Sequence, residues 1–315
     1  MPNVWTHSIY GELVLERLGI RDRIEKDPLA GPLFRFGCQG PDPLFYHRFY
    51  PWTKAARAAS DRLGGLLHRS RCGAFLLAMF RACEGAAPDD PSAVYALGWL
   101  AHHTLDRVAH PYVFARQGSR KYDHQRLETA IDTHLCERLR GIDTRRAPVR
   151  PTLDAGRRLP AAVASLVEDA IRAAYPEEDT PLLRGLWQQS YADMLAAFSL
   201  FHDPTGVKRK LLAGAIEPFV PGRRDEHADP MNERRATWCP PADKSKTSQA
   251  SFWDVWELAL DDGERTIGAA VAWLDASRAA RSAAGDASAR EAAAWRAFAD
   301  ALGDLSYETG LAAER

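Results

Sequence analysis

Apolar residues recur along most of the chain at intervals of three and four, which is the spacing of an amphipathic helix. This pattern predicts helices over residues 7–18, 53–70, 73–84, 91–110, 123–140, 160–174, 180–201, 251–277 and 287–308. The sequence shows no convincing alternation of apolar and polar positions, which is the pattern of strands. We therefore expect an all-α fold, organised as a single multi-helix domain over residues 1–315.

Two stretches interrupt the helical pattern. Residues 20–52 are rich in Gly, Pro and aromatic side chains and are expected to form a long ordered loop. Residues 203–250 are rich in Pro, Arg and Asp, and we expect either a lid or a long crossing loop there. The candidate metal-ligating residues lie within residues 1–140, whereas residues 141–315 are expected to supply further helices.

The helix expected over residues 91–110 is apolar around most of its circumference. Asp90 or Pro91 is a suitable first residue, and Pro111 is expected to end the helix because it cannot continue the hydrogen-bond ladder. A helix with so much apolar surface belongs in the core of the protein.

Five polar residues share two helical faces in this region. His102, Asp106 and His110 are each four residues apart, and His124 and Glu128 repeat that interval on the next expected helix. Burying such groups costs several kcal/mol unless each finds a partner. Imidazole and carboxylate are standard ligands of divalent metals, so the spacing favours a metal site. The alternative is ordinary hydrogen bonding inside a helical core.

Further ligand candidates lie upstream. His7 opens the first helix, Asp42 lies in the rigid loop GPDP, and His68 lies near the end of a helix. His47 is a competing candidate for a ligand position. Each of these residues alone is more commonly a surface or capping residue, so each gains weight only if it converges with the others on one site.

The remaining histidines are expected to lie outside the site. His103 points about 100° away from His102 on the same helix, and His134 lies too far along its helix from His124. His202 and His227 are expected at the surface.

Composition narrows the classes of function. Apolar residues make up 46% of the 315 residues, and the formal net charge is −1, which gives no support for a stable nucleic-acid partner. Five scattered cysteines with no CxxC pair argue against a disulfide framework or a thiolate zinc ribbon. No signal peptide and no run of 18 apolar residues is present, so we expect a cytoplasmic protein without a transmembrane segment.

The chain resembles the zinc-dependent phospholipase C family, which belongs to an all-helical superfamily that also includes single-strand-specific zinc nucleases. The resemblance is carried by MPNVWTH, FGCQGPDPLFYHRF and GGLLHR, and by the His102-to-Glu128 unit, including the 14-residue interval between His110 and His124. These motifs cover roughly residues 1–140. The segments SFWDVWELA and SYETG are expected to be helices of the same architecture.

The resemblance implies two to three zinc ions held by eight side chains. The implied sets are Asp42, His68 and His102; His7 and Asp106, with Asp106 bridging to the first ion; and His110, His124 and Glu128. Iron or manganese also suits such ligands.

One feature departs from the family pattern. Secreted family enzymes use the amino group and carbonyl of an N-terminal tryptophan as metal ligands, whereas the nearest tryptophan here, Trp5, is internal. The ion held by His7 is therefore expected to be absent, weakly bound or completed by water.

The resemblance implies a phospholipase C-like phosphoesterase that hydrolyses a small-molecule or lipid phosphate ester, with Asp42 as the catalytic base. Arg35 and Arg48 flank Asp42 but are expected to be solvated surface residues. An aromatic cluster over residues 34–52 either lines a pocket or packs the loop. Three alternatives stay open: a single-strand nuclease, a specialised biosynthetic metalloenzyme, and a non-catalytic helical scaffold with a structural metal.

Overall fold

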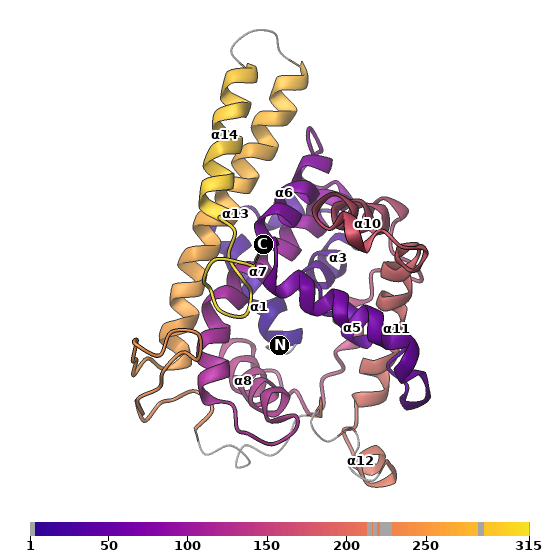
Figure 1. Cartoon of the computed structure of the whole chain (residues 1–315), viewed down its shortest axis with the longest axis vertical. Coiled ribbons are helices and arrows are strands. Elements are labelled where there is room, and N and C mark those ends of the chain that lie inside the picture. The colour runs from indigo at the N-terminus through magenta and orange to yellow at the C-terminus, as the bar shows by residue number, and fades with distance from the viewer. Residues whose placement is uncertain (1–3, 213–215, 217–218, 221–228, 283–286, 315) are drawn as a thin grey trace.

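The fold is a bundle of α-helices that surrounds one long central helix (Figure 1). The computed structural model describes residues 4–212, 216, 219–220, 229–282 and 287–314. Within these ranges it contains helices, turns and three isolated bridges but no strand, which confirms the all-α prediction. The helices are α1 (Val4–Arg17), α2 (Arg21–Ile24), α3 (Ala30–Gly37), α4 (Pro43–Tyr46), α5 (Lys54–Arg69), α6 (Cys72–Ala82), α7 (Pro91–Arg116), α8 (Asp123–Arg140), α9 (Arg150–Leu153), α10 (Ala161–Ala174), α11 (Leu186–Phe201), α12 (Val207–Leu211), α13 (Phe252–Ser282) and α14 (Ala287–Leu302).

Helix α7 is the centre of the core. It packs against α1, α3, α6, α8, α10 and α13, so helices from both halves of the chain cover it. Most of its apolar side chains, among them Trp99 and Leu100, are fully buried. Asp90 caps its first turn by accepting hydrogen bonds from the backbone of Ser92 and Ala93. The burial and the start of this helix are as predicted.

The predicted end of α7 is wrong. The helix continues through Pro111 to Arg116, and Tyr112 and Val113 beyond the proline are buried. Pro111 removes one hydrogen bond to the carbonyl of Arg107 without requiring the helix to stop. Tertiary burial of the extra turn outweighs that loss.

The loop predicted over residues 20–52 is also wrong in part, because the segment contains α2, α3 and α4. Helix α3 lies against α7 at a crossing where both helices carry glycine. A Cβ atom on Gly37 would come within 2.5 Å of the Tyr95 carbonyl, and one on Gly98 within 2.3 Å of the Phe34 carbonyl. The two glycines permit this close approach, which places the residues after α3 beside the ligand face of α7.

Long helices and irregular segments share the C-terminal half. Helices α13 and α14 form an antiparallel pair along one edge of the molecule (Figure 1). Helix α11 begins at Leu186, after two 3-10 turns at Pro176–Glu178 and Pro181–Leu183, and not at residue 180 as expected. Helix α14 ends at Leu302 because Gly303 adopts a left-handed conformation with φ 64°.

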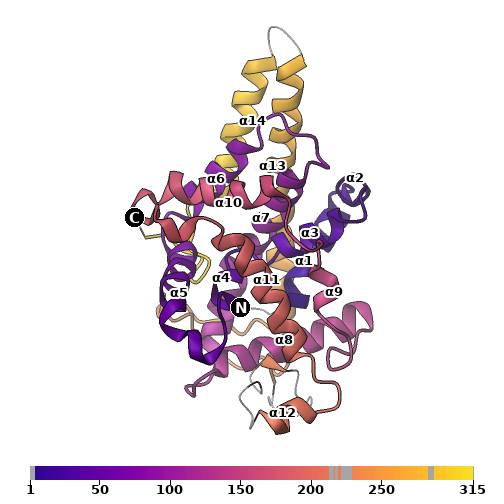
Figure 2. The same ribbon diagram turned by 90° about the vertical axis from the view of Figure 1, so that its right-hand side faces the viewer.

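The prediction that SYETG is helical is therefore wrong. The segment Leu305–Glu314 forms a compact turn that runs back toward the middle of the molecule, beside α5 and α7 (Figure 1, Figure 2).

The described parts of residues 203–250 contain α12 and a loop from Asp229 onward. This loop packs on the central helix: Tyr112 donates to the Pro230 carbonyl, and its ring contacts Trp238 and Phe252. The described portion after Asp229 is thus a crossing loop. Within the described ranges, no helix has both the length and the apolar character needed to cross a membrane.

Candidate metal centre

Eight histidine and carboxylate side chains from five separate segments converge beside α7. Within the described residues they form three groups, each with ligand atoms within 4.8 Å of one another: His7, His102 and Asp106; Asp42, His68 and His102; and His110, His124 and Glu128. All eight predicted ligands are therefore brought together by the fold.

Each ligand is placed by its element. Helix α7 supplies three of them along one face, and α8 supplies two at the same four-residue interval. His7 comes from α1, His68 from the last turn of α5, and Asp42 from the residue that precedes α4. His124 is 19% exposed, whereas the other seven side chains are buried.

Asp106 occupies the middle of the site. Its Oδ2 lies 3.0 Å from His102 Nε2, and its Oδ1 lies 3.3 Å from His7 Nε2. Asp42 Oδ1 lies 3.3 Å from His68 Nε2 and 3.9 Å from His102 Nε2. His102 thus links two of the three groups, since it belongs to both and lies near a carboxylate of each.

The third group lies along the same face of α7. Glu128 Oε1 lies 2.8 Å from His124 Nε2 and 3.6 Å from His110 Nε2. His110 Nδ1 lies 3.6 Å from Asp106 Oδ2, so the three groups adjoin one another.

The imidazole protons are fixed by oxygen acceptors on the far side of four rings. Nδ1 of His68 lies 2.7 Å from the Gly64 carbonyl, and Nδ1 of His102 lies 3.0 Å from the Cys38 carbonyl. Nδ1 of His110 lies 2.9 Å from the Tyr307 carbonyl, and Nδ1 of His124 lies 2.6 Å from Gln117 Oε1. An acceptor at Nδ1 places the proton there and leaves the lone pair on Nε2. Histidines that bind metals are commonly held in this way.

Several buried atoms that face the site have no hydrogen-bond partner within the described part of the chain. They are Nε2 of His7, His68, His102 and His110, Oδ1 of Asp42, and both carboxylate oxygens of Asp106. Such atoms cost free energy when buried without a partner, and a divalent cation satisfies all of them at once. The residues present therefore fit a metal site.

The charges within the site are strongly coupled. Burial and the neighbouring His102 lower the pKa of His7 to about 4, so His7 is neutral at pH 7 and can serve as a ligand. Its ring is stacked on His102 with centroids 4.1 Å apart. Burial opposes ionisation of Asp106, but the charges of His102 and His110 outweigh it and hold the pKa of Asp106 well below its usual range.

The pKa values of His102 and His110 shift in the opposite direction to that of His7. Burial lowers the pKa of His102 and of His110, but the Asp106 charge outweighs burial and raises both pKa values above 6.5. Asp106 and these two imidazoles therefore each favour the charged form of the other.

His103 and His134 lie outside the three groups, as predicted, and so does His47, which was a competing candidate. His103 Nε2 contacts the Leu305 carbonyl at 2.8 Å, and His47 lies 3.8 Å from Asp193. His134 belongs to none of the groups. His202 is partly exposed where α11 ends, which agrees with the expected surface position, and His227 lies outside the described residues.

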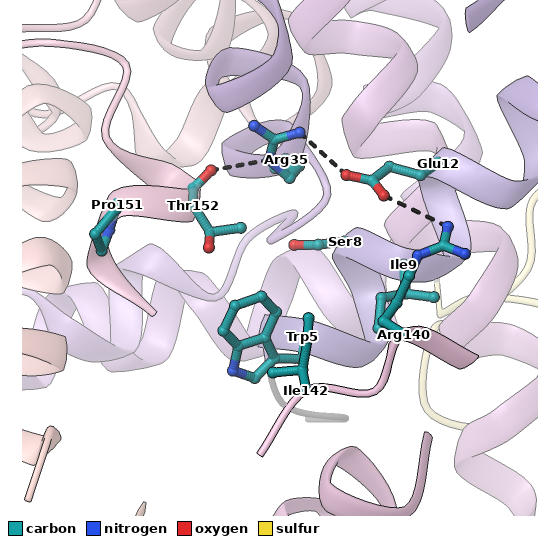
Figure 3. A pocket seen from close by; sticks show the side chains of 9 residues that line it. All are labelled: Trp5, Ser8, Ile9, Glu12, Arg35, Arg140, Ile142, Pro151 and Thr152. Atoms are coloured by element: carbon teal, nitrogen blue, oxygen red, sulfur yellow. Dashed lines mark hydrogen bonds and ion pairs between the residues drawn. The ribbon is translucent and has the colours of Figure 1, made fainter. Parts of the chain in front are cut away.

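A separate pocket of about 360 Å³ lies beside α1, lined by residues that include Trp5, Glu12 and Arg35 (Figure 3). Arg35 is not the solvated residue expected, since it is half-buried and binds Glu12 and the Thr152 carbonyl. No residue of the three ligand groups lines this pocket. Arg35 therefore does not contact the metal site.

The aromatic residues around Asp42 were expected either to line a pocket or to pack the loop, and they do not all behave alike. Phe36 is buried in the core against Tyr191, whereas Phe45 lies 5.6 Å from the His68 ring. Trp52 is 80% exposed. Most of this stretch therefore packs the segment, and Phe45 alone of these three borders the ligands.

Sequence reasoning missed the residues that support the ligands. Asp132 accepts hydrogen bonds from the backbone of Trp5 and Thr6 and so holds the first turn of α1, which carries His7. It extends the four-residue interval of His124 and Glu128, which was a usable signal. Tyr307 lies 197 residues from His110, and no local pattern marks it.

Comparison of the chain with protein-family models, with curated proteins and with solved structures found no match.

Proposed function

We propose that this protein is a metal-dependent hydrolase of phosphate esters, with two to three zinc ions held by the three ligand groups. The observation that carries the proposal is the adjacency of the groups: His102 belongs to two of them, and Asp106 contacts histidines of all three. The resemblance to zinc-dependent phospholipases C supports the same conclusion.

The number of available ligand atoms favours catalysis over a structural metal. Nδ1 of His102 is bound to a carbonyl, so only Nε2 can serve a metal, and it can complete only one of the two groups that share it. Structural zinc sites are closed by four protein ligands, whereas catalytic sites keep a position for water or substrate. The shortage of protein ligands leaves such positions.

When bound, divalent metals supply Lewis acidity toward a phosphate ester and lower the pKa of water. The protein's own residues orient the reactants. Asp42 is the proposed base, because its buried Oδ1 faces His68 and His102 and has no hydrogen-bond partner in the described chain. The surrounding helices exclude bulk water from Asp106 and His102, which are fully buried.

The test combines metal content with turnover. Protein purified without chelators or a histidine tag is expected to contain two to three zinc ions per chain by plasma mass spectrometry. It should hydrolyse bis(p-nitrophenyl) phosphate, p-nitrophenyl phosphate or phosphatidylcholine in mixed micelles. EDTA should abolish the activity, and added zinc should restore it.

Matched carboxylate variants locate the activity. Asp42→Asn is expected to lose at least about 100-fold in kcat/KM, the lower end of what one acid–base group contributes. Asp193→Asn is the control, because Asp193 is nearly buried but contacts Arg48 and Gln189 away from the ligand groups. Equal turnover by both variants would refute the assignment of Asp42.

The alternatives give different results in the same assays. Cleavage of single-stranded DNA in preference to the other esters would favour the nuclease. Predominant iron or manganese would favour another metalloenzyme. Firmly bound zinc with no turnover on any substrate would favour a structural metal in a helical scaffold.

A further inference from the structure

We propose that the C-terminal segment Leu305–Glu314, called the strap below, positions the metal ligands, with Tyr307 as its central positioning residue. The inference rests on the metal binding of the proposed function but not on the reaction.

The backbone of Tyr307 bridges two ligand groups. Its N–H donates to the His68 carbonyl at 3.0 Å, and its carbonyl accepts from His110 Nδ1 at 2.9 Å. His68 belongs to the group with Asp42, whereas His110 belongs to the group with Glu128. One residue of the strap therefore sets the position of α5 relative to the His110 ring on α7.

The side chain of Tyr307 fills the space behind the ligands. Its ring is fully buried and lies 5.2 Å from the His68 ring and 5.7 Å from the His102 ring, measured between centroids. The Tyr307 hydroxyl accepts a hydrogen bond from Trp99 Nε1 at 3.0 Å. The phenol ring thus restricts the rotation of two histidines and is itself held by the core of α7.

The two ends of the strap are also anchored. Glu314 pairs with the chain just after His68, through Glu314 N to the Arg69 carbonyl at 2.7 Å and Arg71 N to the Glu314 carbonyl at 2.9 Å. His103 Nε2 lies 2.8 Å from the Leu305 carbonyl. Both anchors lie next to a ligand in the sequence.

The middle of the strap docks where the proline interrupts α7. Pro111 has no N–H to offer the carbonyl of Arg107, and Gly310 lies against that carbonyl: a Cβ atom there would be 2.3 Å from the oxygen. Gly310 also has a φ of 65°, which other residues adopt at a cost. The strap and the proline-containing turn of α7 therefore fit each other closely.

These contacts act on the metal through the ligands. Hydrogen-bond partners of metal-binding histidines fix the tautomer and the ring orientation, and their loss typically lowers metal affinity 10- to 100-fold. Tyr307 is a positioning residue because it contacts ligands and makes no contact with Asp42, the proposed base, that the structure records.

The decisive comparison is zinc affinity of Tyr307→Ala and Tyr191→Ala, measured by competition with a chromophoric chelator and without substrate. Tyr191 is equally buried and donates to the Gly156 carbonyl, but it touches none of the eight ligands. Tyr307→Ala keeps the backbone groups that meet His68 and His110 but removes the ring behind His68 and His102 and the hydroxyl that holds it to Trp99. Since the backbone then loses its anchor, we expect about a 10-fold loss of zinc affinity in Tyr307→Ala, the low end for loss of such support, and less than a twofold change in Tyr191→Ala. Tyr307→Phe, which keeps the ring and the backbone contacts, should restore wild-type affinity.

A second measurement reports the histidine directly. Nitrogen chemical shifts of ¹⁵N-histidine in the zinc-free protein should show the Nδ1–H tautomer of His110 in wild type. Tyr307→Leu keeps the backbone carbonyl that His110 Nδ1 contacts but loses the bond to Trp99 that holds it in place, so a mixture of tautomers is expected there. This variant keeps most of the buried apolar volume, so it serves if Tyr307→Ala does not fold. A general loss of stability does not predict a tautomer change at one ring.

Unchanged zinc affinity and an unchanged His110 tautomer in a folded Tyr307 variant would overturn the role of the strap. Zinc binding without hydrolysis in the wild-type protein would overturn the proposed function and leave the role of the strap standing. The two proposals therefore fail on different measurements.

Discussion

Replacing Asp106 by Asn should lower Tm when zinc is present and should leave it nearly unchanged or raise it when zinc is absent. The Asp106 carboxylate is fully buried, and both oxygens lack a hydrogen-bond donor in the described chain. Its nearest neighbours are His102 at 3.0 Å, His7 at 3.3 Å and His110 at 3.6 Å. A charge buried in this way is suited to binding a cation and contributes little to the stability of the metal-free fold.

The expected shift with zinc follows from mass action. A ligand at 100 times its Kd stabilises the native state by about 2.7 kcal/mol. An unfolding entropy of about 2.1 cal/mol/K per residue over 315 residues makes 1 kcal/mol worth roughly 1.5 °C. Each zinc ion should therefore raise Tm by about 4 °C, and Asp106→Asn should forfeit at least one ion.

Without zinc, the substitution removes a costly buried charge together with its attraction to His102 and His110. These terms oppose each other, so we expect the Tm of Asp106→Asn in EDTA at pH 8 to lie within about 2 °C of wild type or above it. The assay is calorimetry of both proteins with EDTA and with excess zinc, alongside the zinc content per chain.

One result would refute this reasoning. A fall of about 5 °C or more in EDTA corresponds to the 3–5 kcal/mol expected when one partner of a buried ion pair is removed. Asp106 would then be a structural partner of charged histidines and not primarily a metal ligand.

Three further predictions follow from neighbouring groups. Because the pKa values of His102 and His110 are raised whereas that of His7 is lowered to about 4, zinc binding near pH 7 should release protons from His102 and His110. Affinity should therefore fall as the pH falls through their pKa values, and calorimetry in buffers of different ionisation enthalpy should show the same proton release in His7→Ala. Asp132→Ala removes the carboxylate that holds the first turn of α1. This loss should lower Tm by roughly 2–3 °C in thermal melts, and zinc should be lost only from the group that contains His7. Arg107→Ala breaks the ion pair of the buried Arg107 with the partly buried Asp262 of α13, away from the three ligand groups. It should lower Tm by about 5–8 °C, while mass spectrometry finds an unchanged zinc content.

The spacing of polar residues determined which side chains share a face of one helix. His102, Asp106 and His110 lie together on α7 because the four-residue interval is a local property of the helix, and the same holds for His124 and Glu128 on α8. The all-α class followed from the same periodicity. These features need no knowledge of how the helices pack.

Packing decided where local rules failed. Pro111 disrupts one hydrogen bond, but burial of Tyr112 and Val113 carries α7 beyond it. The segment before Asp42 becomes helical because Gly37 allows it to lie against α7. In each case the deciding energy comes from a distant part of the chain, which a local pattern does not contain.

The sequence by itself thus determined the helical class and the ligands that share α7 or α8. The tertiary structure decided that His7, Asp42 and His68 join those ligands, and that the strap reaches His110 from 197 residues away. The physical reason is the distance along the chain over which each interaction acts. Helical periodicity depends on neighbours within one turn, whereas the ring nitrogen that keeps a histidine lone pair depends on acceptors that only the folded chain brings near.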